Sequence, residues 1–500
     1  MGEAAAPPGT SEHGLKANAI GFTDALVIGL NSTAPAYSLA AVIGLVVVAV
    51  GVQAPAVLLA SFVPMFFIAA AFYYMNRADQ DCGTTFSWVT RAMGPWFGWI
   101  GGWAICTTGI LVVGSLADVA ARYGLLLVGW DSAAESKGAV TALAVVIIAV
   151  MTLICVLGTE LSARVQNVMI FAQVAALLLF AVVALVKGGA LDFSLSWLSP
   201  FALEDTGVLV SGLLIGVFIY WGWESAVNLT EETEDSESAP GIAAVLSTVI
   251  LLVTYVSVTV AVVSFAGLDR VGEFEDDDAI LSTLAGDVLG SPLDQLVVIA
   301  VLTSALASTQ TTILPSSRTV LSMARGGAMP RSLGAVHPRY LTPHVSTILI
   351  GILAAVWYVP VNLLSENFLF DTLSALSLMI AFYYALSGYA CVIYYRRELT
   401  KSVRNFLVIG VAPFVGATML AFLFVRSVRD LADSELSYSG SAVLGLGLPV
   451  VIGAGVLLRG AVLLVAWRIG NPRGYFERRG WEAVSPEIAA GRADPEPVLD

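Results

Sequence analysis

Two long hydrophobic segments of this chain are each interrupted near the middle by a short stretch that does not suit a membrane helix. Residues 18–50 are interrupted at 31–35 (NSTAP), and residues 207–230 are interrupted at 220–224 (YWGWE). A helix that stops within lipid leaves backbone N–H and C=O groups that lipid cannot satisfy. Such a break is tolerated only where protein or a water-filled cavity supplies partners, and the freed groups can hold a polar solute.

The composition places the whole chain in a membrane. Hydrophobic residues make up 57% of the 500 positions and charged residues 12%, which is more apolar sequence than a soluble core can absorb. A spanning helix needs about 20 mainly apolar residues. We therefore predict an all-α protein with twelve transmembrane helices, near residues 20–49, 53–75, 96–129, 139–158, 165–187, 207–230, 241–266, 292–322, 344–361, 370–395, 404–426 and 440–467.

The distribution of positive charge predicts the orientation. Arginine and lysine gather in the connections at 325–339 and 396–404, which lie on the same side as the N-terminus if twelve helices cross the membrane. By the positive-inside rule, both termini are cytoplasmic and the protein lies in the cell membrane. Residues 1–17 and 468–500 would form cytoplasmic tails.

Several other functional classes receive no support. Much of the net charge of −14 lies in an outer loop near residue 275 and in the C-terminal tail, which indicates solvation and gives no reason to expect a nucleic-acid partner. The four cysteines are scattered, and the three histidines fit no metalloprotease spacing. We predict no cofactor, no metal and no catalytic residue, so the chain is not expected to be an enzyme.

The positions of the two breaks predict an internal repeat. Each break lies in the first helix of a run of five, as in inverted repeats of five plus five helices. The first repeat would cover residues 18–190 and the second residues 207–398, with two accessory helices in 404–467. The partners of such a fold are the lipid bilayer and a small solute.

The first break offers groups that suit a carboxylate. The N–H groups that begin a half-helix carry partial positive charge, and Ser32 and Thr33 add hydroxyls beside Ala34. At the second break, the carbonyls of Ile219 and Tyr220 carry the opposite partial charge and suit an ammonium group. The alternative for the first break is a simple proline kink with Ser/Thr bonded to the preceding turn.

The second break also carries an acid and several aromatic residues. Glu224 follows Gly222, and a carboxyl group within the membrane is a candidate for binding a cation or carrying a proton. The alternative is a carboxyl group that only bonds the unwound backbone. Phe218 and Trp223 are placed to close over a ligand or to stack on an ammonium group, although aromatic residues in apolar helices most often serve packing.

A third set of polar residues lies in the eighth predicted helix. Ser304, Ser308 and Thr311 are spaced by three or four residues and therefore share one helix face. Such a stripe can line a solute path or ligate a cation. Its alternative is hydrogen bonding between packed helices, which is the commoner role of Ser and Thr in membranes.

Three local patterns resemble the amino acid/polyamine/organocation (APC) transporter superfamily. They are residues 83–99 (GTTF through GPWFGW), 220–225 (YWGWES) with Glu231 and Glu232, and 318–330 ending in MARGGAMP. The resemblance covers almost all of residues 18–468. It implies two inverted repeats that hold a substrate between the two breaks, with Phe218 as the gating aromatic and Glu224 at a commonly acidic position.

The chain departs from the superfamily pattern at two positions. Members often have a Gly-x-Gly element in the first break, whereas here Pro35 has no N–H to offer a carboxylate. Some proton-coupled members have a lysine in the fifth helix where this chain has Gln173, which makes Gln173 a coupling position and leaves proton, sodium and exchange modes open.

We therefore expect a secondary active transporter, a permease that moves an amino acid or a related amine or polyamine by alternating access. The coupling ion would be a proton or sodium. The rival interpretations are a multi-spanning sensor or intramembrane enzyme, and a channel. Neither rival accounts for breaks at corresponding points of two repeats.

Overall fold

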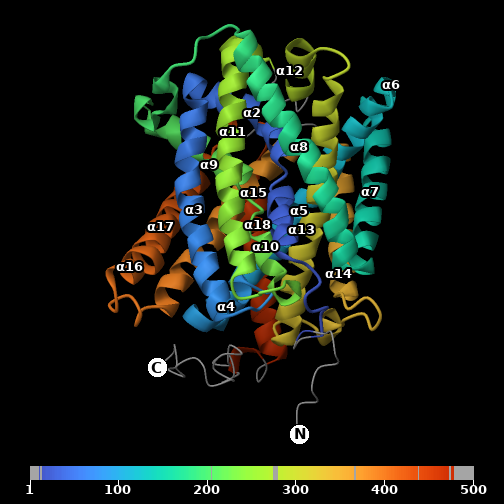
Figure 1. The fold of residues 1–500 in the computed structure, drawn as a ribbon. Coiled ribbons are helices and arrows are strands. Elements are labelled where there is room, and N and C mark those ends of the chain that lie inside the picture. The colour runs from blue at the N-terminus through green and yellow to red at the C-terminus, as the bar shows by residue number, and fades with distance from the viewer. Residues whose placement is uncertain are drawn as a thin grey trace.

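The computed structural model describes residue 11 and residues 14–203, 205–273, 280–364, 368–436, 439–471 and 475–477. Within these residues, the protein is a bundle of helices with one short β-hairpin (Figure 1). Among the described residues, ten helical stretches are long and apolar enough to cross a membrane. The predicted all-α membrane fold is confirmed at this level, and the predicted tails lie largely outside the described residues.

The first half of the bundle runs to the loop before residue 206. Its helices are α1 (Phe22–Ser32), α2 (Pro35–Val50), α3 (Ala54–Ala78), α4 (Thr85–Met93), α5 (Pro95–Leu127), α6 (Asp131–Ala134), α7 (Lys137–Leu157) and α8 (Thr159–Lys187). The second half contains α9 (Thr206–Ile219), α10 (Ser225–Asn228), α11 (Ala239–Gly272), α12 (Ile280–Leu289), α13 (Gln295–Arg325), α14 (His344–Leu364) and α15 (Phe368–Tyr394). The remainder comprises α16 (Val403–Asn405), α17 (Ala412–Asp430), the strands β1 (Ala442–Val443) and β2 (Leu446–Gly447), and α18 (Leu448–Gly470).

Both predicted breaks are present in the structure. Helix α1 ends at Ser32 and α2 begins at Pro35, with Ala34 in the left-handed region at φ 49° and ψ 63°. Proline suits the first position of a helix but disfavours α geometry in the residue before it, so Pro35 ends one helix and starts the next. Helix α9 ends at Ile219, and the turn that follows leads into α10 at Ser225.

Small residues allow the central helices to pack closely. Helix α5 packs along α13, and a Cβ atom at Gly109 would lie 2.0 Å from Ser316 Oγ. The half-helix α9 packs on α3 in the same way, because a Cβ atom at Gly216 would lie 2.0 Å from Ser61 Oγ. Small residues at such contacts are typical of membrane helices, where packing replaces the hydrophobic drive.

The half-helices on either side of the breaks pack crosswise. Helix α1 contacts α10, and α2 contacts α9. Helices α3, α8, α11, α13 and α15 contact these four half-helices. The breaks therefore lie inside the bundle, away from lipid.

The structure corrects several boundaries. The connection between the predicted helices at 53–75 and 96–129 contains the nine-residue helix α4, whose apolar face is buried. The fifth helix begins at Thr159, after Gly158 at φ 147°, and the last helix begins at Leu448, after the hairpin at 442–447. By length and composition alone, the described residues contain ten candidate membrane spans and not the predicted twelve. Residues 22–78 form one continuous candidate span, and residues 207–219 form an apolar helix that is shorter than the other spans.

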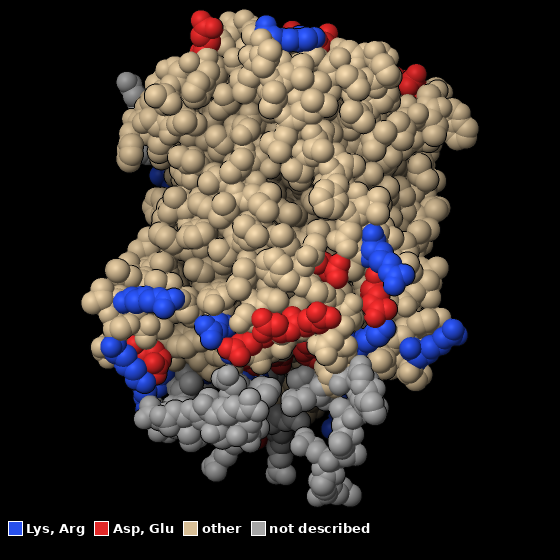
Figure 2. Space-filling view, in the orientation of Figure 1, with Lys and Arg blue, Asp and Glu red and all other residues tan. Residues whose placement is uncertain are grey.

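The surface agrees with a membrane position. Figure 2 shows charged side chains near the two ends of the molecule, with many at the lower end and a broad, nearly uncharged belt between them. Large apolar side chains are exposed on the long helices, such as Phe171 and Val186 on α8. Such exposure is expected where lipid, and not water, surrounds the protein.

Candidate functional site

The two breaks touch each other in the centre of the bundle. Ser32 Oγ and Ser225 Oγ are 2.7 Å apart and share a hydrogen bond. Gly222 lies against the backbone of the first break, since a Cβ atom there would be 2.6 Å from the Ser32 carbonyl oxygen. Gly222 also has φ 119°, a conformation that favours glycine. The fold therefore brings the predicted site residues Ser32 and Gly222 together.

Hydroxyl groups of α13 bind the first break. Ser308 Oγ donates to the Ser32 carbonyl oxygen at 2.9 Å, and the Tyr37 N–H donates to Ser304 Oγ at 3.3 Å. Two of the three predicted stripe residues thus satisfy backbone groups that the break frees. Thr311 differs, because its hydroxyl donates to the Ala307 carbonyl of its own helix at 3.0 Å.

The hydroxyl groups of Thr33 and Ser38 bond locally. Thr33 Oγ1 donates to the Leu30 carbonyl at 2.6 Å, and Ser38 Oγ donates to the Thr33 carbonyl at 2.7 Å. Pro35 has no N–H, and the Tyr37 N–H is taken by Ser304. A carboxylate that binds at the start of α2 would therefore compete with these internal bonds around Ala34.

Side-chain amides connect the first break to α8 and α13. Gln173 Nε2 donates to Asn31 Oδ1 at 3.0 Å, and Asn31 Nδ2 donates to the Gln166 carbonyl at 2.9 Å. Gln166 Nε2 in turn donates to Gln310 Oε1 at 2.8 Å. Gln173, which the sequence singled out for coupling, therefore contacts the break directly. Gln166 and Gln310 were not predicted, since isolated Gln residues in apolar helices gave no pattern.

Glu224 is bound by three donors from the protein. It lies at the start of α10, with its side chain 4% exposed. Tyr383 Oη donates to Glu224 Oε1 at 2.6 Å, Tyr384 Oη donates to Oε2, and the Gly222 N–H donates to Oε2 at 3.1 Å. The adjacent tyrosines of α15 were missed from the sequence, because two aromatic residues in an apolar helix resemble ordinary packing.

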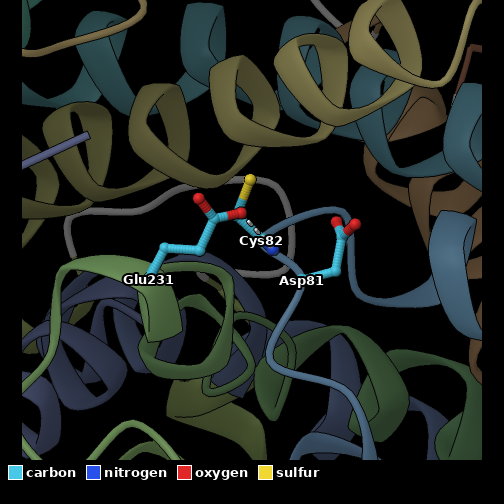
Figure 3. Close-up of side chains that lie close together, drawn as sticks. All are labelled: Asp81, Cys82 and Glu231. Carbon is cyan, nitrogen blue, oxygen red and sulfur yellow. Dashed lines mark hydrogen bonds between the residues drawn. The ribbon is translucent and has the colours of Figure 1, made fainter. Parts of the chain in front are cut away.

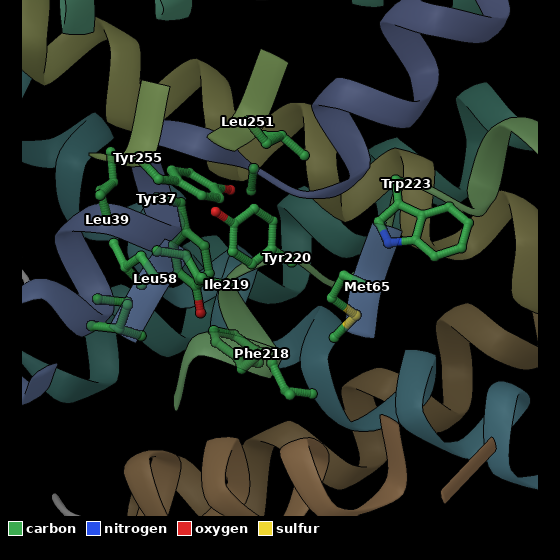
Figure 4. Packing of buried hydrophobic residues seen from close by; sticks show 14 of the residues in the cluster. Tyr37, Leu39, Leu58, Met65, Phe218, Ile219, Tyr220, Trp223, Leu251 and Tyr255 are labelled. Carbon is green, nitrogen blue, oxygen red and sulfur yellow. The ribbon is translucent and has the colours of Figure 1, made fainter. Parts of the chain in front are cut away.

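The aromatic residues of the second break separate into two groups (Figure 4). Tyr220 packs edge-on to Tyr255 of α11 with ring centroids 5.3 Å apart, and Phe218 lines a pocket beside α2. Trp223 points elsewhere and stacks on Tyr384 at 5.3 Å. Tyr220 Oη and Trp223 Nε1 are buried and have no hydrogen-bond partner among the described residues. Buried groups of this kind usually find a ligand or a water.

A buried ion pair lies where α13 meets the segment after α10. Arg318 of α13 donates from Nε to Glu232 Oε2 at 2.9 Å and from Nη2 to Oε1 at 3.0 Å, with both side chains 0% exposed. Thr159 at the start of α8 accepts from Arg318 Nη2 at 3.1 Å. The backbone of Glu232 also accepts the Ala19 N–H just before α1 at 2.7 Å. This network, which we call the lower latch, joins α1, α8, α13 and the segment after α10.

One cluster of side chains near the lower latch has the composition of a metal site (Figure 3). It consists of Asp81, Cys82 and Glu231, whose ligand atoms lie within 4.8 Å of one another. Each acid is already bound, because Asp81 accepts from Ser322 Oγ at 2.7 Å and Glu231 accepts the Cys82 N–H at 3.2 Å. Burial raises the pKa of the Cys82 thiol well above its ordinary value, and the two carboxylates add to this effect. Bonds within the protein therefore account for the positions of both acids without a metal ion.

Comparisons with known proteins identify the family of this chain. The family described as "Amino acid permease" matches residues 20–448. The chain is 26% identical over 291 residues to the branched-chain amino acid permease BcaP of Bacillus subtilis, covering 56% of this chain and 57% of that relative. It is 24% identical over 380 residues to the low-affinity putrescine importer PlaP of Escherichia coli, covering 73% of this chain and 79% of that protein.

A solved structure shares the fold. MhsT, determined in complex with L-phenylalanine, matches with a TM-score of 0.60 at 15% identity, covering 80% of this chain and 98% of MhsT. At this identity the likeness concerns the fold alone. The ten apolar helical stretches among the described residues and the family match indicate a multi-pass membrane protein, and the relatives named above are transporters. The chain belongs to the amino acid permease family, within the APC superfamily that its motifs resemble.

The contact at Gly222 gives a first prediction. Gly222→Ala places a methyl group against the Ser32 carbonyl, which is backbone and cannot turn away, in a conformation that alanine rarely adopts. We expect a loss of about 1–3 kcal/mol of stability and a strong loss of transport. Gly455→Ala is the matched control, because a Cβ atom at Gly455 meets nothing within 4 Å. Thermal unfolding and uptake of the two variants provide the measurement, and equal behaviour would contradict the described contact.

The lower latch gives a second prediction. Arg318→Met leaves Glu232 buried without its partner, which should cost about 3–5 kcal/mol of unfolding free energy. The exposed pair of Lys401 and Glu398, at 2.6 Å, provides the control, because Lys401→Met should cost less than about 1 kcal/mol. Thermal unfolding in detergent compares the two. A similar small effect in both variants would show that Arg318 and Glu232 are not paired in the buried state.

Proposed function

We propose that this permease is a secondary active transporter that moves an amino acid or a related amine across the cytoplasmic membrane by alternating access. The observation that carries the proposal is the contact between two helix breaks inside the bundle, at Ser32 and Gly222. Irregular backbone at membrane depth is typical of transporter binding sites. The relatives BcaP and PlaP, named for a branched-chain amino acid and for putrescine, support the solute class.

The proposed topology has twelve spans. Helices α1 and α2 together make one span, and α9 and α10 make another. By length alone, α1 and α2 merge with α3 into one candidate span, and α9 is too short to be one. The crosswise contacts of α1 with α10 and of α2 with α9 support two inverted repeats of five spans. Spans α17 and α18 are then accessory, and the lower end of the bundle faces the cytoplasm with both termini.

The proposed substrate site uses the ends of the half-helices. The start of α2 near Thr33 and Ala34 attracts a carboxylate through its partial positive charge. The last carbonyl groups of α9, at Ile219 and Tyr220, attract an ammonium group. The unpartnered Tyr220 Oη adds a hydrogen-bonding group at the same break.

The proposed cycle begins from a state that is closed at the lower end. The lower latch joins α1 and the segment after α10 to α8 and α13 through Arg318 and Glu232. Opening toward the cytoplasm requires these elements to separate, so the latch must break and reform in each cycle. Glu224 connects the second break to α15 through Tyr383 and Tyr384, which makes it the proposed coupling group.

Uptake into proteoliposomes tests the proposed function. The full chain is purified and reconstituted, and a panel of labelled amino acids and polyamines is offered with sodium and proton gradients imposed separately. We expect saturable uptake of at least one compound, because alternating access exposes one site at a time. Flux that rises linearly with concentration would favour a channel. The absence of any protein-dependent flux or exchange would contradict the transporter assignment for these solutes.

The coupling role of Glu224 is tested separately. Glu224→Gln keeps the size of the side chain but removes its charge and its capacity to bind a proton. Its NH₂ group would face either Tyr383 Oη or the two donors Tyr384 Oη and Gly222 N–H. We expect the uptake rate to fall and to lose its response to a proton gradient. The exposed Glu234→Gln serves as the control. A wild-type protein that ignores the gradient, or a variant that follows it equally well, would contradict the role.

A further inference from the structure

The connection between α15 and α17 carries a dense group of positive charges, although the chain as a whole has a net charge of −14. Within residues 396–404, four side chains are cationic and one is acidic, which gives a formal charge of +3. The cations are Arg396, Arg397, Lys401 and Arg404. The acid, Glu398, binds Lys401 at 2.6 Å and cannot balance all four. The segment is therefore a local positive surface on an acidic protein.

Large apolar side chains are exposed directly beside these charges. Val403 is 76% exposed, Phe406 53% and Leu407 51%. We call residues 396–407, which carry both kinds of side chain, the basic turn. Basic and apolar side chains next to each other are typical of segments at a membrane surface, where the apolar groups enter the acyl boundary and the cations meet the headgroups.

Hydrogen bonds within the basic turn give it a defined shape. Ser402 Oγ accepts the Asn405 N–H at 3.0 Å and caps α16. Asn405 Nδ2 donates to the Glu398 carbonyl at 3.3 Å. Leu399 packs on the helical turn that follows, since a Cβ atom at Gly410 would lie 3.1 Å from Leu399 Cδ2. The cations therefore project from an ordered turn.

The basic turn lies at the border of the uncharged belt. Figure 1 shows α16 on the lower flank of the bundle, beside α17. Figure 2 has the same orientation and shows Lys and Arg side chains on that flank, where the belt gives way to the charged lower end. Other cations of the lower end have acids of their own, as in the pairs of Arg77 with Glu237 at 3.0 Å and Lys16 with Glu160 at 2.7 Å.

We propose that the basic turn binds the headgroups of anionic phospholipids in the cytoplasmic leaflet. The arginine and lysine side chains bind the phosphate groups, while Val403, Phe406 and Leu407 lie in the acyl boundary. This inference rests on the proposed topology, in which the lower end faces the cytoplasm. Lipid is favoured over a soluble anion because only a lipid covers the exposed apolar side chains as well as matching the charge.

Native mass spectrometry of the purified full chain in detergent measures this binding directly. The protein is titrated with phosphatidylglycerol, which is anionic, and in parallel with phosphatidylcholine of the same acyl chains. We expect phosphatidylglycerol to bind about tenfold more tightly or better. Equal affinity for the two lipids would overturn the proposal. Because the measurement requires neither transport nor a fixed orientation, that result would leave the proposed function standing.

A competition experiment separates a lipid from a free anion. Glycerol 3-phosphate carries the anionic group without acyl chains. We expect a large excess of it to leave phosphatidylglycerol bound, since the apolar side chains share the binding. Displacement of the lipid by glycerol 3-phosphate would overturn the assignment to a lipid.

Two double variants locate the lipid site. Arg397→Gln with Arg404→Gln removes two charges from the basic turn and should weaken phosphatidylglycerol binding by about tenfold. Arg331→Gln with Arg339→Gln is the matched control at the same end of the molecule. It removes two exposed arginines from the described connector 326–343, which has no large exposed apolar side chain.

We expect the control to change the affinity by less than about twofold, because charge alone without apolar neighbours holds a lipid weakly. Thermal unfolding of both double variants checks that they fold. An equal loss of affinity in the two, or an unchanged affinity in the first, would overturn the proposed site.

Discussion

The requirement that every backbone group inside a membrane find a partner governs the rest of this structure. Two helices stop in mid-bundle, and the groups they free are bound by other parts of the protein. Ser308 donates to the carbonyl of Ser32, and Ser304 accepts the N–H of Tyr37. The side chains of Ser32 and Ser225 then bond the two breaks to each other. The breaks are therefore a mutually supported unit, since each would be costly alone.

Charge is handled differently at the centre and at the lower end. At the centre, the carboxylate of Glu224 is surrounded by neutral donors from Tyr383, Tyr384 and the backbone. At the lower end, Glu232 forms a fully buried, bidentate salt bridge with Arg318. The centre therefore carries no fixed positive charge, whereas breaking the buried ion pair at the lower end is costly. This contrast suits a binding region in the middle and a closed gate at one end.

The sequence predicts the breaks well and their surroundings poorly. Pro35 and the polar run before it interrupt an apolar segment, so the end of α1 could be placed within a residue or two. The contact of Gly222 with Ser32 could not be placed, because the two residues are far apart in the chain. The tyrosines that bind Glu224 carry no periodic signal, and α4 was hidden in a stretch that reads as a polar loop. Short-range patterns specify helix ends, whereas partners across the bundle depend on packing.

The central claim is that the two unwound stretches, and not the flanking helices, hold the solute. An experimental structure of the full chain with a bound amino acid tests it most directly. The account predicts density for the solute between residues 33–34 and residues 219–222, with its carboxylate toward the start of α2 and its ammonium group toward the end of α9. Continuous helices through residues 31–35 and 220–224, or a solute bound elsewhere in the bundle, would contradict it.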